Sequence, residues 1–190
     1  MRLLNKLTDN KKYNIISFNY TLPFLYNKDS SNFLQVYKNV HGHIDNRIFN
    51  KTEKGETSSI IFGIDSQGIN PKSPEYKFTK TYRTLDTTYK TVKDLLNHNI
   101  SEIIFYGHSL NKSDFSYFMA VFDNFDIYNN TKLSLTFAYN STVPHDKIDK
   151  FNQVSNLMFE YGRTLNNNHG NNLLHKLIIE GRISLKDIHL

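Results

Sequence analysis

The stretch that decides the fold is "EIIFYGHSLNKSD", which runs from Glu102 to Asp114. It begins as an almost continuous apolar run, which is typical of a strand buried on both faces, as in a parallel sheet. The chain then turns at "GHS" and enters "SDFSYFMAVFDNF", where apolar residues recur at helical spacing. Ser113 or Asp114 is the expected N-cap, because a short side-chain oxygen can accept hydrogen bonds from the exposed amides of a first turn.

The same order of strand and helix is expected along the rest of the chain. Further strands are predicted at residues 14–18, 35–40, 59–62 and 132–139. One long helix is predicted over residues 75–99, because it carries a single apolar stripe. The stripe consists of Phe78, Tyr82, Leu85, Tyr89, Val92 and Leu96. Two more helices are predicted to end just before Gly162 and Gly181. This alternation predicts an α/β fold with a Rossmann-like, mostly parallel sheet flanked by helices.

Length and composition narrow the class of protein. The 190 residues suggest a single domain spanning 1–190. The absence of cysteine excludes disulfides, thiolate metal sites and a cysteine nucleophile. The net charge of +5 comes from scattered lysines and arginines, so a nucleic-acid-binding surface is not expected. No apolar run approaches the ~20 residues of a membrane span, and the first residues lack a signal peptide. We therefore expect a soluble, cytoplasmic protein.

Three strand ends carry polar residues that could form a binding site. They are "SFNYT" at 17–21, "VHGHID" at 40–45 and "YGHSLNKSD" at 106–114. In a parallel sheet the carboxyl ends of the strands line the ligand crevice. Asn19, His41 and Ser109 are therefore expected to converge, although they lie far apart in the sequence.

The turn at Ser109 also permits a different interpretation. The first three positions of the G-x-S-x-G nucleophile elbow are present, but Asn111 occupies the place of the last glycine. A serine esterase would then need an acid and a histidine, in that order, further along the chain. Asp126 and either His145 or His169 are available. The simpler alternative is that Ser109 caps or lines a turn.

The stretch "HGHID" could in principle hold a metal ion. On an extended strand His41, His43 and Asp45 would share one face. Gly42 interrupts that strand, however, and no further ligand is evident, so no metal is predicted. For Asn19 the simpler alternative is an Asx-type turn.

The ordered set "FNYT", "VHGHID", "IIFG" and "YGHSLNKSD" resembles the AbiH family of bacterial phage abortive-infection proteins. It also resembles, more distantly, sirtuin-like defence families, which carry T-N-Y-D-like, H-G and G-x-S…D motifs in the same order. The later stretch "RTLNNNHGNNLLHKLIIEG", residues 163–181, is similar to the C-terminal part of AbiH proteins. The resemblance thus spans residues 14–181.

The resemblance implies a sirtuin-like sheet that binds NAD or a related nucleotide. By motif, Asn19 and His41 correspond to the catalytic pair of sirtuin-like NAD hydrolases. The glycine of the H-G motif is Gly42, and Gly107, Ser109 and Asp114 match the G-x-S…D positions that flank the nucleotide. Tyr20-Thr21 stands where many sirtuin-like sequences have Tyr-Asp.

One feature of AbiH-like proteins has no counterpart in this sequence. They typically begin with a strand and a "GNGFD"-like turn, whereas no glycine precedes Gly42 here. We therefore expect a chain that is truncated at its N-terminus, or half of a split pair. Three functions follow as hypotheses. The first is a phage-defence protein that binds or cleaves NAD. The second is a non-catalytic sensor or assembly module that responds to a phage-derived trigger through an N-terminal partner chain or a homo-oligomer. The third is a serine esterase.

Overall fold

The computed structural model describes residues 2–21, 33–42, 60–66, 68–86, 95–167 and 169–188. The chain divides into two compact units. The first consists of residues 8–95, and the second of residues 2–7 and 96–190.

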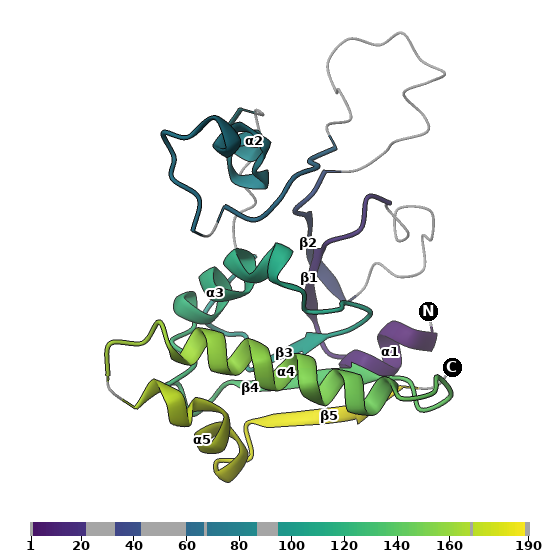
Figure 1. Cartoon of the computed structure of the whole chain (residues 1–190). Helices are drawn as coiled ribbons and strands as arrows, with labels where there is room; N and C mark the ends of the chain where they lie inside the picture. The colour runs from purple at the N-terminus through teal and green to yellow at the C-terminus, as the bar shows by residue number, and fades with distance from the viewer. Residues whose placement is uncertain are drawn as a thin grey trace, which may run out of the picture. The chain divides into compact units, whose positions relative to one another are not determined.

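The first unit is built on two parallel strands. β1 (Tyr13–Ser17) pairs with β2 (Leu34–Asn39), and the register shifts just after Tyr13. Figure 1 shows the two strands side by side. Each lies within one residue of its predicted position. Because Ser17 and Asn39 are partners in this register, the carboxyl ends of both strands lie at the same edge.

The strand predicted at residues 59–62 is not present as expected. Ser59 lies outside the described residues, and residues 60–63 form no strand. Instead, the amide of Ile61 donates to the carbonyl of His41 at 2.9 Å. A few residues later, Ile64 forms one isolated parallel bridge with Thr79. Residues 60–64, which we call the strap, therefore join the end of β2 to the segment around Thr79 by single contacts instead of a ladder.

The long helix predicted over residues 75–99 is wrong at its start. A 3₁₀ turn, η3 (Pro74–Phe78), is followed by Thr79 in an extended conformation (φ −79°, ψ 150°). Helix α2 (Lys80–Asp86) begins only after it. The hydroxyl oxygen of Thr79 accepts the amide of Tyr82 at 3.1 Å, so this residue caps α2. Residues 87–94 of the prediction lie outside the described residues, and residues 95–99 form turns and no helix, so the prediction is also wrong at its end.

The apolar stripe of that predicted helix is not buried within its described part. Phe78 is 54% exposed, Tyr82 45% and Leu85 79%. Helical spacing of apolar residues predicted a buried face, and the structure shows an exposed one.

The second unit contains a three-stranded parallel sheet. Its strands are β3 (Glu102–Phe105), β4 (Ser134–Tyr139) and β5 (Ile183–Asp187), in the order β3-β4-β5. Its helices are α1 (Arg2–Thr8, of which residues 2–7 belong to this unit), α3 (Phe115–Asn124), α4 (Asp146–Gly162) and α5 (Leu173–Ile179). Two short 3₁₀ turns, η4 (Lys112–Asp114) and η5 (Gly170–Asn172), precede α3 and α5. The parallel sheets and flanking helices of the two units confirm the predicted α/β class, whereas β5 and α1 were not predicted.

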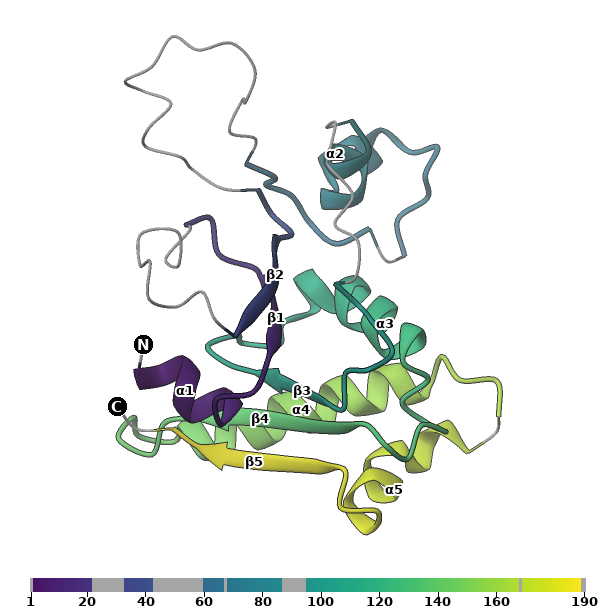
Figure 2. The ribbon, with the colours of Figure 1, turned by 180° about the vertical axis from the view of Figure 1, so that it is seen from behind.

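Helices cover both faces of the second sheet. On one face, the rings of Phe105 and Phe137 stack at 4.5 Å, and Phe118 and Phe122 of α3 pack edge-on against Phe105. Helix α4 lies in front of β4 in Figure 1 and behind it in Figure 2. On the other face, Leu7 of α1 packs with a small cluster that includes Ala138 and Ile188. Full burial of a phenylalanine, leucine or isoleucine side chain contributes about 1.5–3 kcal/mol to the stability of the fold.

The end of α4 meets η5 through two glycines. A Cβ placed on Gly162 would lie 2.2 Å from the carbonyl oxygen of Gly170, and one on Gly170 would lie 1.9 Å from that of Gly162. The expectation that α4 ends just before Gly162 is therefore off by one residue, because this glycine is the last helical residue. Gly162 instead allows the backbones of α4 and η5 to lie in close contact.

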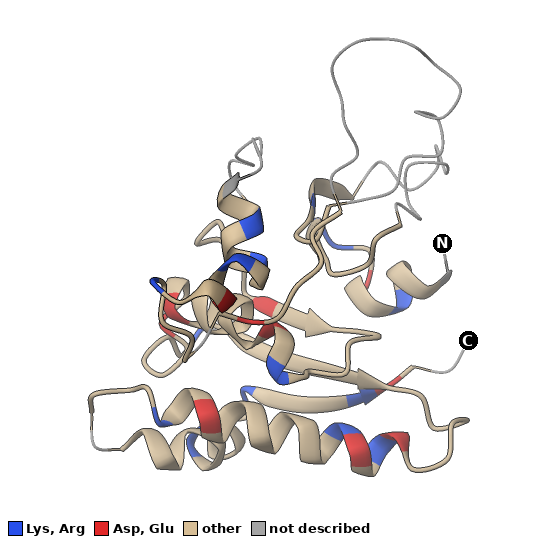
Figure 3. Ribbon diagram, turned by 45° about the horizontal axis from the view of Figure 1, so that its top comes forward, with Lys and Arg blue, Asp and Glu red and all other residues tan. Residues whose placement is uncertain are grey.

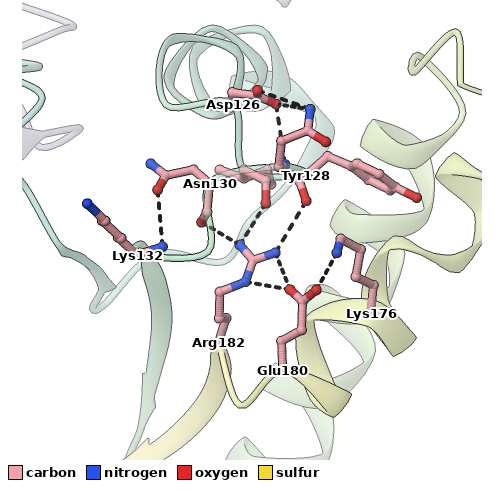
Figure 4. A network of polar contacts seen from close by, with 9 residues as sticks. Asp126, Tyr128, Asn130, Lys132, Lys176, Glu180 and Arg182 are labelled. Carbon is pink, nitrogen blue, oxygen red and sulfur yellow. Dashed lines mark hydrogen bonds and ion pairs between the residues drawn. The ribbon is translucent and has the colours of Figure 1, made fainter.

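Arg182 holds the turn before β5 against the loop after α3 (Figure 4). The side chain is 5% exposed, and its guanidinium donates to the carbonyls of Ile127 at 2.8 Å and Asn130 at 3.0 Å. Glu180 accepts from the Nε atom of Arg182 at 2.7 Å and also pairs with Lys176. These hydrogen bonds lower the pKa of the Glu180 carboxyl, with Lys176 making the largest contribution.

Charges of both signs are distributed along the elements of the structure. Acidic and basic residues alternate in the first turns of α4, and neither sign forms a continuous field over the described helices (Figure 3). Among the described residues, no helix has the length and apolar character needed to cross a membrane.

Candidate functional site

The first candidate site lies at the carboxyl ends of β1 and β2. Asn19 follows β1 and His41 follows β2, as the sequence predicted. The buried side chain of Asn39 ties the two strand ends together. Its amide nitrogen donates to the backbone oxygen of Asn19, and its oxygen accepts the amide of His41 at 3.3 Å. The backbones of the two predicted catalytic residues therefore share one side-chain bridge.

His41 is buried, with 3% of its surface exposed, and lies in an aromatic environment. Its ring centroid is 5.4 Å from that of Phe18 and 6.0 Å from that of Tyr20. The ring of Tyr20 in turn lies 5.0 Å from Phe62, which is 57% exposed. A continuous row of rings thus leads from the buried histidine to the surface of this unit.

The Nε2 atom of His41 faces a lysine. The Nζ atom of Lys80, the first residue of α2, lies 3.4 Å away, at the long end of hydrogen-bond range. An ammonium group donates hydrogen bonds and accepts none, so Nε2 must be the acceptor. In that contact the lone pair of Nε2 points to the ammonium group. A neutral histidine with a lone pair on Nε2 is the form that can accept a proton.

Gly42 follows His41 with a φ of +69°, which lies in the left-handed region that favours glycine. It is buried, three residues after the end of β2. The side chain of Asn19, by contrast, is exposed, and its backbone amide donates to the Ser17 hydroxyl at 3.3 Å. Asn19 is thus placed at the surface of the strand-end cluster, where an amide group can reach a ligand.

The second group of predicted site residues follows β3 in the other unit. Gly107 turns the chain with a φ of +64°. Ser109 is exposed, whereas Leu110 is 2% exposed and has a φ of +50°. The strain in this turn therefore falls on Leu110, and Ser109 has an ordinary backbone conformation.

Asp114 is buried and its carboxylate is used inside the turn. It lies 3.3 Å from Nε2 of His108, and the Ser113 hydroxyl donates to it at 3.2 Å. It occupies the N-cap position of α3, but it makes no side-chain capping hydrogen bond. The predicted position is thus correct, whereas the predicted capping interaction is absent.

The Nδ1 atom of His108 also forms a hydrogen bond. Nδ1 accepts the amide of Leu110 at 2.8 Å, so Nε2 carries the proton that points at Asp114. Lys150 of α4 donates to the carbonyl of His108 at 2.7 Å. Burial lowers the pKa of the Lys150 amine, while the nearby Asp146 carboxylate partly opposes this shift. The turn after β3 is therefore fixed on both sides of Ser109.

This geometry does not support Ser109 as a nucleophile. A nucleophile elbow strains the serine itself, and here the strain lies one residue later. Within the described part of the chain, no histidine is hydrogen-bonded to the Ser109 hydroxyl. His145 and His169 instead occupy the N-cap positions of α4 and η5.

The structure describes only part of the possible metal-binding stretch. His43 and Asp45 lie outside the described residues. Within the described ranges, no group of three or more histidine or acidic side chains is arranged to hold a metal ion.

Three residues of the first site were not predicted from the sequence. Asn39 precedes the H-G motif by two residues, and a polar residue at the end of a strand was the only available signal. Lys80 lay on the polar side of a predicted amphipathic helix, where a charged side chain is expected to be solvated. Gly63 was part of the quoted "IIFG" motif, but nothing in the sequence indicated what it contacts.

Asn19, His41 and Gly42 belong to one unit, and Gly107, Ser109 and Asp114 to the other. Their convergence on one ligand stays a prediction. Each unit is an α/β layer with chemically functional side chains at the carboxyl ends of parallel strands, where ligand-binding α/β proteins place their sites.

Comparison with known families identifies the class more closely. The chain matches the family described as "Bacteriophage abortive infection AbiH" over residues 2–139. It therefore belongs to the AbiH family. The matched region contains all four motifs from "FNYT" to "YGHSLNKSD" and ends before residues 163–181. No curated protein and no solved structure matches the chain.

Proposed function

We propose that this AbiH protein acts in phage defence by binding NAD or a related nucleotide at the Asn19–His41 cluster and cleaving its glycosidic bond. Family membership implies the first part, abortive infection by a phage-defence protein. The observation that supports the second part is the buried imidazole of His41 beside Asn19 at the carboxyl ends of two parallel strands.

The chemistry of the cluster suits this reaction. When NAD is hydrolysed, the bond between ribose C1′ and the nicotinamide nitrogen breaks, and its electron pair returns to the positively charged ring. The ring leaves as a neutral molecule, so no acid is needed. The oxygen of a water molecule bonds to C1′, and a proton of that water passes to the Nε2 atom of His41. The exposed Asn19 amide can both donate to and accept from the ribose hydroxyls.

The row of aromatic rings supports a nucleotide as the ligand. A base can stack on an exposed aromatic ring, which contributes about 1–3 kcal/mol per base in single-stranded nucleic-acid complexes. Phe62 is exposed and contacts Tyr20, which in turn contacts His41. A base stacked on Phe62 would therefore lie at the outer end of a row whose inner end is the proposed catalytic histidine.

The test is incubation of the purified chain with NAD, alone and with a lysate of phage-infected cells, while NAD loss and NAD binding are measured. We expect loss with the wild-type protein and at least a hundredfold slower loss with His41→Ala, since general base catalysis contributes about 10²–10⁴-fold. His175→Ala is the matched control, because His175 is exposed on α5. Neither loss nor binding of NAD under any of these conditions would refute the proposal.

A second candidate function is a non-catalytic sensor or assembly module. The observation that favours it is the exposed apolar surface of the first unit. Ile64 is 53% exposed, and Phe62, Phe78, Tyr82 and Leu85 are also exposed. Large exposed apolar side chains often mark interaction surfaces. Light scattering after size-exclusion chromatography tests this function: a concentration-dependent oligomer would support it, and a monomer at all concentrations would count against it.

A further inference from the structure

We infer that two copies of this chain associate about a twofold axis, through the outward face of helix α4 and the free edge of strand β5. The partner is therefore a second copy of the chain. The residues that carry this inference all lie in the second unit, so it goes beyond the nucleotide chemistry proposed for the first.

The first step concerns helix α4, which carries two apolar stripes. One stripe faces the core of the unit and consists of the buried residues Val154, Leu157, Met158 and Tyr161. The other consists of Ile148, Phe151 and Phe159, each of which is more than half exposed. These three residues and the half-buried Ser155 share one face of the helix, because they recur at steps of three and four. Contiguous exposed apolar side chains mark an interaction surface.

The second step concerns the direction in which this exposed stripe points. Lys150 reaches the carbonyl of His108, which follows β3. It lies about 140° around the helix from Ser155, since each residue turns the helix by about 100°. Gly162, on the side of the stripe, instead meets Gly170, which precedes α5 and β5. Because the strand order is β3-β4-β5, the stripe points toward the β5 side of the sheet.

The third step concerns the edge of the sheet on that side, which β5 forms among the described strands. The amide of Leu135 in β4 donates to the carbonyl of Arg182, and the amide of Ile188 also bonds to β4. Backbone groups alternate between the two sides of a strand, so those of Ile183 and Leu185 point away from β4. An edge with outward N–H and C=O groups can pair with a further strand.

The fourth step is that the stripe is complementary to itself. A twofold axis places two α4 helices antiparallel, with the same surface on both copies. With Ser155 at the crossing point, Phe151 of one copy lies opposite Phe159 of the partner subunit. The small serine side chain allows the two helices to approach where they cross.

The charges beside the stripe fit the same register. Asp149 is exposed in the first turn of α4, and Arg163 is exposed directly after its last residue. The two lie at nearly equal distances along the helix on either side of Ser155. The pairing that brings the phenylalanines together therefore also brings Asp149 to Arg163 of the partner subunit. Opposite charges at the rim of an apolar contact fix its register, and here they specify a second copy of the same helix.

The first experiment is sedimentation velocity of the full chain at several concentrations. We expect a dimer, and we expect Phe151→Asp to raise its dissociation constant by about tenfold or more, because the carboxylate would be buried in an apolar contact. Leu85→Asp is the matched control. It changes an exposed apolar residue of the first unit in the same way and should leave the dimer intact.

The second experiment is a charge reversal in the same assay. Asp149→Arg and Arg163→Asp should each weaken the dimer, because each places like charges opposite one another across the twofold axis. The double variant should restore the affinity, since it pairs opposite charges again. Recovery of this kind requires that the two residues meet in the dimer.

The third experiment uses the absence of cysteine from the chain. Ser155→Cys introduces a single thiol, which a short bismaleimide should link to the same residue of the second copy. The product is a covalent dimer on a denaturing gel. Ser101→Cys, an exposed position just before β3 at the other edge of the sheet, is the control and should stay monomeric.

The outcomes are independent of NAD cleavage, because the dimer is measured without a ligand. A monomer at every concentration would overturn the inference, and so would a dimer that Phe151→Asp leaves intact or that only Leu85→Asp disrupts. Failure of the double charge reversal to restore the dimer would also overturn it. Circular dichroism identifies an unfolded variant. If Phe151→Asp does not fold, the charge reversals at exposed positions decide the question.

Discussion

The carboxylate of Asp114 lies 3.3 Å from Nε2 of His108, across the turn that also carries Ser109. The Nδ1 atom of the same ring accepts a hydrogen bond from the amide of Leu110. The imidazole therefore connects the two ends of the turn. Asp114 thus helps, through His108, to hold the turn that carries Ser109.

Loss of the Asp114 carboxylate should destabilise the second unit. We expect Asp114→Ala to lower the free energy of unfolding by about 1–3 kcal/mol, because the half-buried donor on His108 loses its partner. Ser109→Ala is the control, since the exposed serine should change stability by about 0.5 kcal/mol or less. Urea unfolding followed by circular dichroism measures both. Equal stability of the two variants would show that the contact between His108 and Asp114 does not stabilise the fold.

The contact between Gly162 and Gly170 predicts a severe effect of a single methyl group. A Cβ on Gly162 would overlap the carbonyl oxygen of Gly170, so α4 and η5 would have to separate. We expect Gly162→Ala to cost about 1–3 kcal/mol, as is typical of overpacking. Asn156→Ala, at an exposed site on α4, is the comparison. If both variants unfolded at the same urea concentration, the close contact would be disproved.

Tyr161 predicts a loss of stability at alkaline pH. Burial raises the pKa of its phenol well above the usual value, and the hydrogen bond to Asp123 raises it further. The folded state therefore keeps a proton that the unfolded state loses near pH 10. The contribution of this residue to stability is complete below pH 10 and falls as pH rises above it. Tyr161→Phe should flatten this decline.

Unfolding free energies at several pH values between 8 and 11 test this prediction. The difference between wild type and Tyr161→Phe isolates this phenol from the other groups, including Lys150, whose lowered pKa acts in the opposite direction. Parallel pH profiles for the two proteins would contradict the assignment.

The close contact of Gly63 with residues 78–80 predicts that Gly63→Ala changes the environment of His41 by displacing Lys80. The added methyl group would displace the backbone of residues 78–80, so Lys80 should move away from His41. We expect the Nε2 signal of His41 to change in the same direction as in Lys80→Met, while Lys72→Ala leaves it in place. Histidine NMR of the three variants provides the comparison. An unchanged His41 signal in a folded Gly63→Ala protein would show that the strap does not position Lys80 beside His41.

Several elements could be predicted from the sequence because their signals are local. The apolar runs of β1 and β3 mark buried parallel strands, and the apolar periodicity of α3 and α4 marks helices packed on one face. Strand β5 was missed because "ISLKD" is short and half polar, and only its pairing with β4 makes it a strand. The predicted long helix was wrong at Thr79, because a bridge to Ile64 holds that residue extended.

The candidate site could be predicted only in part, for the same reason. Asn19 and His41 follow recognisable strands, so their placement at one sheet edge follows from the parallel arrangement. The position of Lys80 beside His41 depends on contacts across the unit. Its backbone amide bonds to the strap residue Ile64, and no periodicity in the sequence encodes an interaction between residues about forty positions apart.

The most direct test of the central claim is the NAD concentration in phage-infected bacteria that express this chain. We expect NAD to fall after infection with the wild-type protein and not to fall with His41→Gln, which removes the imidazole. An unchanged NAD level in wild-type cells that still resist the phage would contradict the account, as would an equal fall with His41→Gln.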